Sequence, residues 1–83
     1  MKIDEQELNK SVCEMEAQTR KMAIQELHRI RTSKKYTISE VSYLTGYPND
    51  TLDRFEIGRR SVSLYVICLL AKIYGKSVRI VFE

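Results

Sequence analysis

The side chains that could carry out acid–base chemistry in this sequence are few. His28 is the only histidine, and Asp50 and Asp53 lie three residues apart, on one face of any helix that contains them. Acid–base catalysis needs burial or a close partner to tune the reacting group, and an exposed helix face offers neither. The sequence also contains no Gly-rich phosphate loop and no nucleophile elbow. It therefore predicts a protein that is not an enzyme.

Metal binding and disulfide formation are not indicated either. Cys13 and Cys68 lie in no CxxC or Cys/His cluster, and His28 has no ligand-type residue at metal-binding spacing. We therefore expect no cofactor, no metal, and a surface or packing role for His28. No apolar run approaches the roughly 20 residues needed to cross a bilayer, and no apolar leader precedes the acidic N-terminus. These features predict a cytoplasmic protein that does not associate with membranes.

The charged residues are unevenly distributed along the 83 residues. Up to Thr19, two basic residues accompany five acidic ones, whereas from Arg20 onward 12 basic residues accompany six acidic ones. A basic surface attracts a polyanion, and an acidic one does not. The sequence therefore predicts a polyanionic partner for the part of the chain after residue 19.

The elements that must position these side chains are mainly helical. No Pro or Gly interrupts residues 4–31, which predicts a helical run. Its apolar residues recur at spacings of four and three in two stripes that are displaced around the helix: Leu8, Val12, Met15, Thr19 and Met22, then Ala23, Leu27 and Ile30. We therefore place a soft boundary near residues 18–20, where the charge balance also changes.

Three shorter helices are predicted after this run. Thr37 and Glu40 have the capping-box spacing that starts a helix, and Gly46 suits the left-handed position that ends one. The next helix is expected over residues 48–57, with Pro48 in its first turn. The last is expected from Ser63 to Gly75, and because it is apolar nearly all round we predict that it is the central buried helix.

The last seven residues alternate in the manner of a strand. Val78, Ile80 and Phe82 alternate with Arg79, Val81 and Glu83, and the chain offers no second strand to pair with them. A chain this short also buries a small core. We therefore predict a homodimer in which the residue 77–83 strands pair or cover the partner's core, with the N-terminal helix adding contacts.

Residues 41–60 contain two short helices joined by a glycine turn, which is the helix-turn-helix arrangement. Residues 24–75 resemble the lambda-repressor-like, Xre-type family of DNA-binding proteins. The matching positions are Leu27, Ile30, Arg31, Val41, Ser42, Gly46, residues 51–56, Gly58, Arg59, Arg60, Ser63, Leu64, Leu70, Ala71, Tyr74 and Gly75. The resemblance implies a mostly α, compact, four- to five-helix domain, to which we add the short C-terminal β-strand.

The resemblance also implies roles for individual residues. With Leu52 and Phe55 turned inward at 100° per residue, the outward side chains of helix 48–57 would lie in the major groove of double-stranded DNA. Arg31 and Glu56 would form a structural ion pair. The expected DNA-binding residues are Thr37, Tyr47, Asn49, Asp50, Thr51, Asp53, Arg54, Arg59 and Arg60.

Two parts of the motif depart from the family pattern. Ile38 replaces the glutamine that usually braces a phosphate, and Asp50 and Asp53 bring carboxylates to the face that reads DNA. Carboxylates repel phosphate, although aspartate can accept a hydrogen bond from cytosine and asparagine can bind adenine.

Taken together, these features predict a sequence-specific DNA-binding transcription regulator of bacterial or phage type, acting as a repressor. Its segments would be an N-terminal helical extension for assembly (1–19), the helix-turn-helix domain (20–76) and the C-terminal strand (77–83). The alternative is a protein-interaction module with the same fold, such as an antitoxin that binds a toxin or another protein partner.

Overall fold

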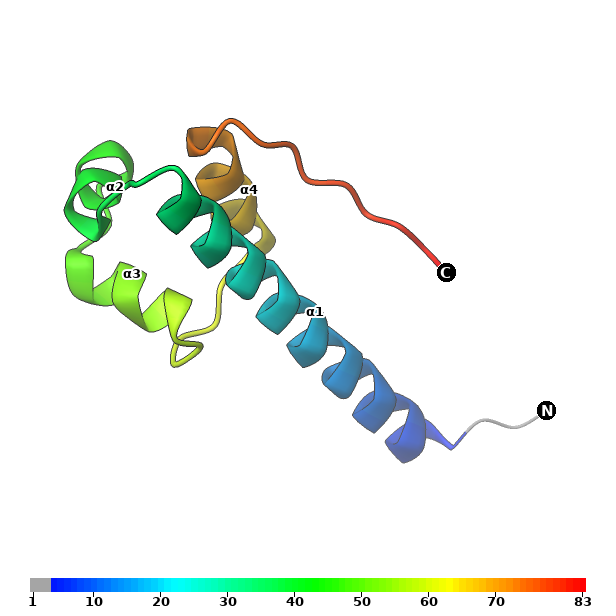
Figure 1. Ribbon diagram of the computed structural model, residues 1–83. Helices are drawn as coiled ribbons and strands as arrows, with labels where there is room; N and C mark the ends of the chain where they lie inside the picture. The colour runs from blue at the N-terminus through cyan, green and yellow to red at the C-terminus, as the bar shows by residue number, and fades with distance from the viewer. Residues whose placement is uncertain (1–3) are drawn as a thin grey trace.

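The computed structural model describes residues 4–83 and contains four helices in this range. They are α1 (Glu5–Ser33), α2 (Ile38–Thr45), α3 (Asn49–Glu56) and α4 (Leu64–Ile73). In Figure 1, α2, α3 and α4 gather around the C-terminal half of α1, and the N-terminal half of α1 projects beyond them. The prediction of a mostly α, compact domain of four to five helices is confirmed, with four helices present.

One hydrophobic core joins the four helices. It consists of Ile24, Leu27, Ile30, Val41, Leu52, Phe55, Val62, Val66, Ile67, Leu70, Ala71 and Tyr74. The fully buried residues of α1 begin at residue 24, whereas the side chains of residues 5–19 are all exposed. α1 is nevertheless a single continuous helix of 29 residues across the boundary that the sequence suggests near residues 18–20.

The helix ends follow the local capping signals. The Thr37 side chain accepts from the Glu40 N–H while Glu40 reaches back to the Thr37 backbone, which completes the capping box of α2. Ser63 caps α4 by accepting from the Val66 N–H. Pro48, expected inside the first turn, is instead the N-cap residue of α3, so this helix is one residue shorter at each end than predicted.

The strand predicted over residues 77–83 is wrong. Among residues 4–83 the structure contains no β-strand, and the chain after α4 has no regular secondary structure. A strand needs a neighbour for its backbone hydrogen bonds, and none is available within this part of the chain. Ile80 and Phe82 are consequently 69% and 93% exposed.

α4 differs from prediction in how much of its surface it buries. Val66, Ile67, Leu70 and Ala71 face the core, but Leu64 and Tyr65 are 57% and 72% exposed. The other three helices within residues 4–83 do not cover every side of α4, so an apolar sequence on all sides of this helix does not place it at the centre of the domain.

Candidate nucleic-acid interface

α3 is fixed to the domain by its two buried apolar side chains. Leu52 and Phe55 are 2% and 4% exposed. The Phe55 ring meets the ring of Tyr47 edge-to-face, with 6.0 Å between centroids. Because Leu52 and Phe55 are three residues apart, they anchor one face of α3 and turn the opposite face outward.

The turn between α2 and α3 is closed by a left-handed glycine and local hydrogen bonds. Gly46 has φ 80°, and its N–H donates to the Ser42 carbonyl at 2.8 Å. The Ser42 hydroxyl then donates to the Tyr47 carbonyl at 2.6 Å, and the Tyr47 N–H donates to Thr45 Oγ1 at 3.2 Å. These bonds set the angle at which α3 leaves α2, and they hold half-buried Tyr47 beneath α3.

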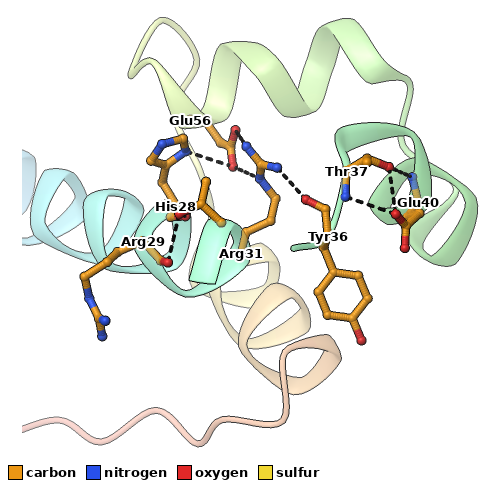
Figure 2. A network of polar contacts seen from close by, with 8 residues as sticks. His28, Arg29, Arg31, Tyr36, Thr37, Glu40 and Glu56 are labelled. Atoms are coloured by element: carbon orange, nitrogen blue, oxygen red, sulfur yellow. Dashed lines mark hydrogen bonds and ion pairs between the residues drawn. The ribbon is translucent and has the colours of Figure 1, made fainter. Parts of the chain in front are cut away.

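An arginine on α1 secures the other end of α3. Arg31 Nε donates to Glu56 Oε1 at 2.5 Å, and an Arg31 terminal nitrogen donates to Glu56 Oε2 at 3.1 Å. A second Arg31 nitrogen donates to the Tyr36 carbonyl at 2.6 Å, so one guanidinium ties α1 to α3 and to the loop before α2 (Figure 2). His28 Nδ1 also lies 3.3 Å from the Glu56 carboxylate.

The electrostatics of this cluster follow from its hydrogen bonds and burial. The Arg31 and Glu56 side chains are 13% and 17% exposed. The hydrogen bonds to Glu56 raise the pKa of Arg31 above its ordinary value, so the guanidinium stays charged. Burial, reinforced by the Glu56 charge, raises the pKa of nearby Tyr74 to about 12, which keeps the phenol neutral.

Four predicted DNA-binding residues lie on the exposed face of α3: Asn49, Asp50, Asp53 and Arg54. Asn49 Nδ2 donates to Ser39 Oγ at 3.3 Å, which orients the amide at the start of α3 against α2. Thr51 is half-buried at the side of the helix. The outward face of α3 therefore presents one amide, two carboxylates and one guanidinium.

Thr37 lies at the start of α2, where its hydroxyl serves the helix cap. Thr37 Oγ1 accepts from the Glu40 N–H at 3.1 Å and lies at the same distance from Glu40 Oε1. Half-buried Ile38 follows it and packs against the core. The Thr37 hydroxyl is thus occupied by the helix cap, and the Ile38 side chain cannot form hydrogen bonds.

The two arginines after α3 are held close to its C-terminal end. The backbone N–H groups of Arg59 and Arg60 both donate to the Arg54 carbonyl, at 2.9 and 3.3 Å. Gly58, with φ 76°, allows this tight reversal. The Arg60 guanidinium lies 5.7 Å from the centre of the Phe55 ring, a cation–π contact, whereas Arg59 makes no side-chain hydrogen bond or ion pair within residues 4–83.

The structure adds residues of α1 to this surface that the sequence did not reveal. One terminal nitrogen of Arg20 donates to Ser61 Oγ at 2.9 Å, and the other pairs with Glu16 at 2.6 Å. An open groove of about 480 Å³ runs between this part of α1 and the loop after α3, and Arg20, Lys21, Arg59 and Arg60 contribute to its lining. Because Arg20 and Ser61 are 41 residues apart, no local sequence signal could join them.

Comparison with known proteins identifies this arrangement. A family model described as helix-turn-helix matches residues 27–81, about two thirds of the chain. The chain belongs to the lambda-repressor-like, Xre-type helix-turn-helix family. No curated protein and no solved structure gave a significant match to it.

Family membership indicates a DNA-binding regulator, and domains of this family are typically not enzymes. The family match includes the turn, α3 and the two arginines that follow it.

Within residues 4–83, no helix has both the length and the hydropathy to span a membrane.

Proposed function

We propose that this helix-turn-helix protein is a sequence-specific transcriptional repressor that places α3 in the major groove of double-stranded DNA. The observation that carries the proposal is the polar outward face of α3. This face is anchored from behind by Leu52 and Phe55 and is followed at once by exposed Arg59 and Arg60. A rigid helix with a polar face and a cationic border is what base reading next to a phosphate backbone requires.

The exposed side chains of α3 can form hydrogen bonds with different bases. Asn49 can form two hydrogen bonds with adenine, and Arg54 can form two with guanine. Asp50 and Asp53 can each accept a hydrogen bond from the amino group of cytosine. Thr37, Tyr47 and Thr51 lie at the edges of this surface and would contribute through backbone or van der Waals contact, because Thr37 is engaged in its cap and Tyr47 in packing.

The phosphate contacts come from the loop after α3 and from the adjoining turn of α1. Arg59 is the strongest candidate, because its side chain is exposed and makes no other polar contact within residues 4–83. The Arg60 guanidinium contacts the Phe55 ring and is also exposed to solvent. Arg20 and Lys21 extend the same positive surface across the groove. Such contacts bind DNA of any sequence and make the affinity depend on salt.

A second function is favoured by the carboxylates on α3. Asp50 and Asp53 are both exposed on the face that would meet DNA, where they repel phosphate. Half-buried Ile38 supplies no hydrogen bond at the start of α2. The alternative is therefore a protein-interaction module, such as an antitoxin whose α3 face binds a basic protein partner.

Fluorescence polarisation with labelled duplex DNA tests the proposal. The duplexes would be a random sequence and a site selected from a random library, each titrated at low and moderate salt. We expect Arg59→Gln to weaken both duplexes about equally and to reduce the salt slope by about one unit. Asn49→Ala should cost about 1–3 kcal/mol on the selected site alone. Arg29→Gln, which alters an arginine paired with Glu26 on α1, is the matched control.

Asp50→Ala separates the two functions. If Asp50 accepts from cytosine, the variant loses affinity for the selected site; if it only repels the backbone, the variant gains affinity for random DNA. If Asp50 contacts a protein, neither duplex responds. Failure of the folded wild-type protein to bind any duplex at low salt would overturn the proposal in favour of the interaction module.

A further inference from the structure

The N-terminal half of α1 carries an apolar stripe that no part of residues 4–83 covers. Leu8, Val12, Met15 and Met22 are 49%, 51%, 69% and 59% exposed, although they lie on one face of the helix. The remaining member, Thr19, donates its hydroxyl to the Met15 carbonyl at 2.7 Å, so its methyl group is free for apolar contact. A contiguous exposed stripe on a projecting helix marks an interaction surface.

The stripe has the spacing of a coiled coil. Its members recur at alternating intervals of four and three, which places Val12 and Thr19 at one core position of a heptad and Leu8, Met15 and Met22 at the other. We propose that this stripe binds the same stripe of a second copy, so that two α1 helices form an antiparallel coiled coil. The pairing itself does not depend on DNA binding; its antiparallel direction is supported by the proposed function.

The residues that flank the stripe are compatible with self-pairing. In the antiparallel register, Val12 of each copy lies opposite Met15 of the other, and Leu8 lies opposite Thr19. Asn9 then faces Glu16, and Ser11 faces Gln18, so the flanks bring no like charges together. The charged residues Glu7, Lys10, Glu14, Arg20 and Lys21 remain on the outer surface. Met22 lies opposite Glu5 of the other copy at each end of the paired segment, where Glu5 is exposed in the single chain, so a second copy fits the stripe without bringing like charges together.

The direction of pairing follows from where the domain lies on α1. Ile24, Leu27 and Ile30 form the face of α1 that packs into the core. At 100° per residue, the centre of the stripe lies roughly a quarter turn around the helix from this face. The twofold axis of an antiparallel pair is perpendicular to the plane of the two helices. In an antiparallel pair, the core-packing faces of the two α1 helices, each a quarter turn from the stripe, therefore point to the same side. A parallel pair would place the two domains on opposite sides.

The spacing of the two domains is also consistent with DNA. Residue 24, where the core begins, lies about ten residues from the centre of the paired segment, or roughly 15 Å along the helix. The two cores therefore begin roughly 30 Å apart, on the same side. Half-sites that are read by a dimer are centred about 34 Å apart, one turn of the duplex. Antiparallel pairing thus places both domains on one side of the pair, at a separation on the scale of one turn of the duplex.

Sedimentation equilibrium at micromolar protein concentration tests the pairing. We expect wild-type protein to show twice the 9.7 kDa mass of one chain. Met15→Glu should show a single-chain mass while retaining a cooperative thermal transition by circular dichroism. Tyr65→Glu, which alters an exposed apolar residue of α4 away from the stripe, should remain a dimer. A monomeric wild-type protein, or a dimer that survives Met15→Glu, would overturn the proposal.

Disulfide crosslinking tests the direction. In a background with Cys13→Ser and Cys68→Ser, equal amounts of Val12→Cys and Met15→Cys protein would be mixed and oxidised. Antiparallel pairing predicts that the mixed crosslink dominates, whereas dominance of the two like crosslinks would show a parallel pair and contradict this direction. Duplex DNA binding by the same proteins is measured separately. A stripe-dependent dimer that binds no DNA would uphold this inference and overturn the proposed function.

Discussion

At the scale of single residues, the Glu56 carboxylate ties the end of α3 to two side chains of α1. It accepts two hydrogen bonds from Arg31 and lies beside His28, and Arg31 in turn holds the Tyr36 carbonyl. The cluster links α1, α3 and the loop before α2. The orientation of α3 therefore depends on one partly buried ion pair as well as on apolar packing.

We expect the loss of either member of this pair to destabilise the domain. Glu56→Ala should lower the free energy of unfolding by about 1–4 kcal/mol, because it leaves a partly buried guanidinium without its carboxylate. Arg31→Ala should cost somewhat more, because it also removes the donor to the Tyr36 carbonyl. Urea unfolding of both single variants and of the double variant would measure the coupling energy between the Arg31 and Glu56 side chains.

The control for this cycle is the Arg29–Glu26 pair on the exposed surface of α1. Its side chains are 66% and 55% exposed, so removing Glu26 should have a much smaller effect than removing Glu56. The double variant Arg31→Ala/Glu56→Ala should cost less than the sum of the single changes. Strict additivity would mean that the two side chains contribute independently and that their contact carries no coupling energy.

At the scale of elements, the turn between α2 and α3 depends on the backbone conformation of Gly46. Its φ of 80° lies in the left-handed region, and a Cβ placed there would meet no heavy atom within 4 Å. Gly46→Ala should therefore destabilise the protein through backbone strain alone, by about 1 kcal/mol. Gly46→Asn should cost less, because asparagine tolerates this conformation better. Equal stability of wild-type and alanine variants in thermal unfolding would contradict this explanation.

The elements that sequence reasoning placed correctly are those with local start and stop signals. The Thr37–Glu40 capping box, the Ser63 cap and the left-handed Gly46 each act within a few residues, so the bounds of α2 and α4 could be predicted closely. The residue 77–83 strand could not, because a strand depends on a partner elsewhere. The Arg20–Ser61 contact was missed for the same reason, since it forms only after α1 and the loop beyond α3 meet.

At the scale of the whole molecule, charge and shape divide the chain into two parts. The helix-turn-helix domain carries the basic groove and the polar face of α3, whereas the projecting half of α1 is acidic and apolar. The acidic part would repel a phosphate backbone if it lay against DNA. Pairing with a second copy would give this segment a role that keeps the basic surfaces free.

The exposed tail allows a prediction about which segments hold the molecule together. The side chains of Val78, Ile80 and Phe82 are 41%, 69% and 93% exposed, so they add little to the core of one chain. Ending the chain after Lys76 would keep the Lys76 N–H bond to the Ala71 carbonyl at 2.8 Å, which closes the end of α4. We therefore expect deletion of residues 77–83 to change the free energy of unfolding by no more than about 0.5 kcal/mol, as for surface changes generally.

The same deletion distinguishes the two ways in which copies could associate. If association runs through α1, the shortened protein should sediment at the same mass as the full chain and unfold at the same urea concentration. A fall in mass to that of one chain, with the domain still folded, would show that the tail binds the partner. A loss of stability well above 1 kcal/mol would instead show that the tail packs on its own domain. The α1 stripe, with its heptad spacing and flanks that bring no like charges together, makes the unchanged mass the expected result.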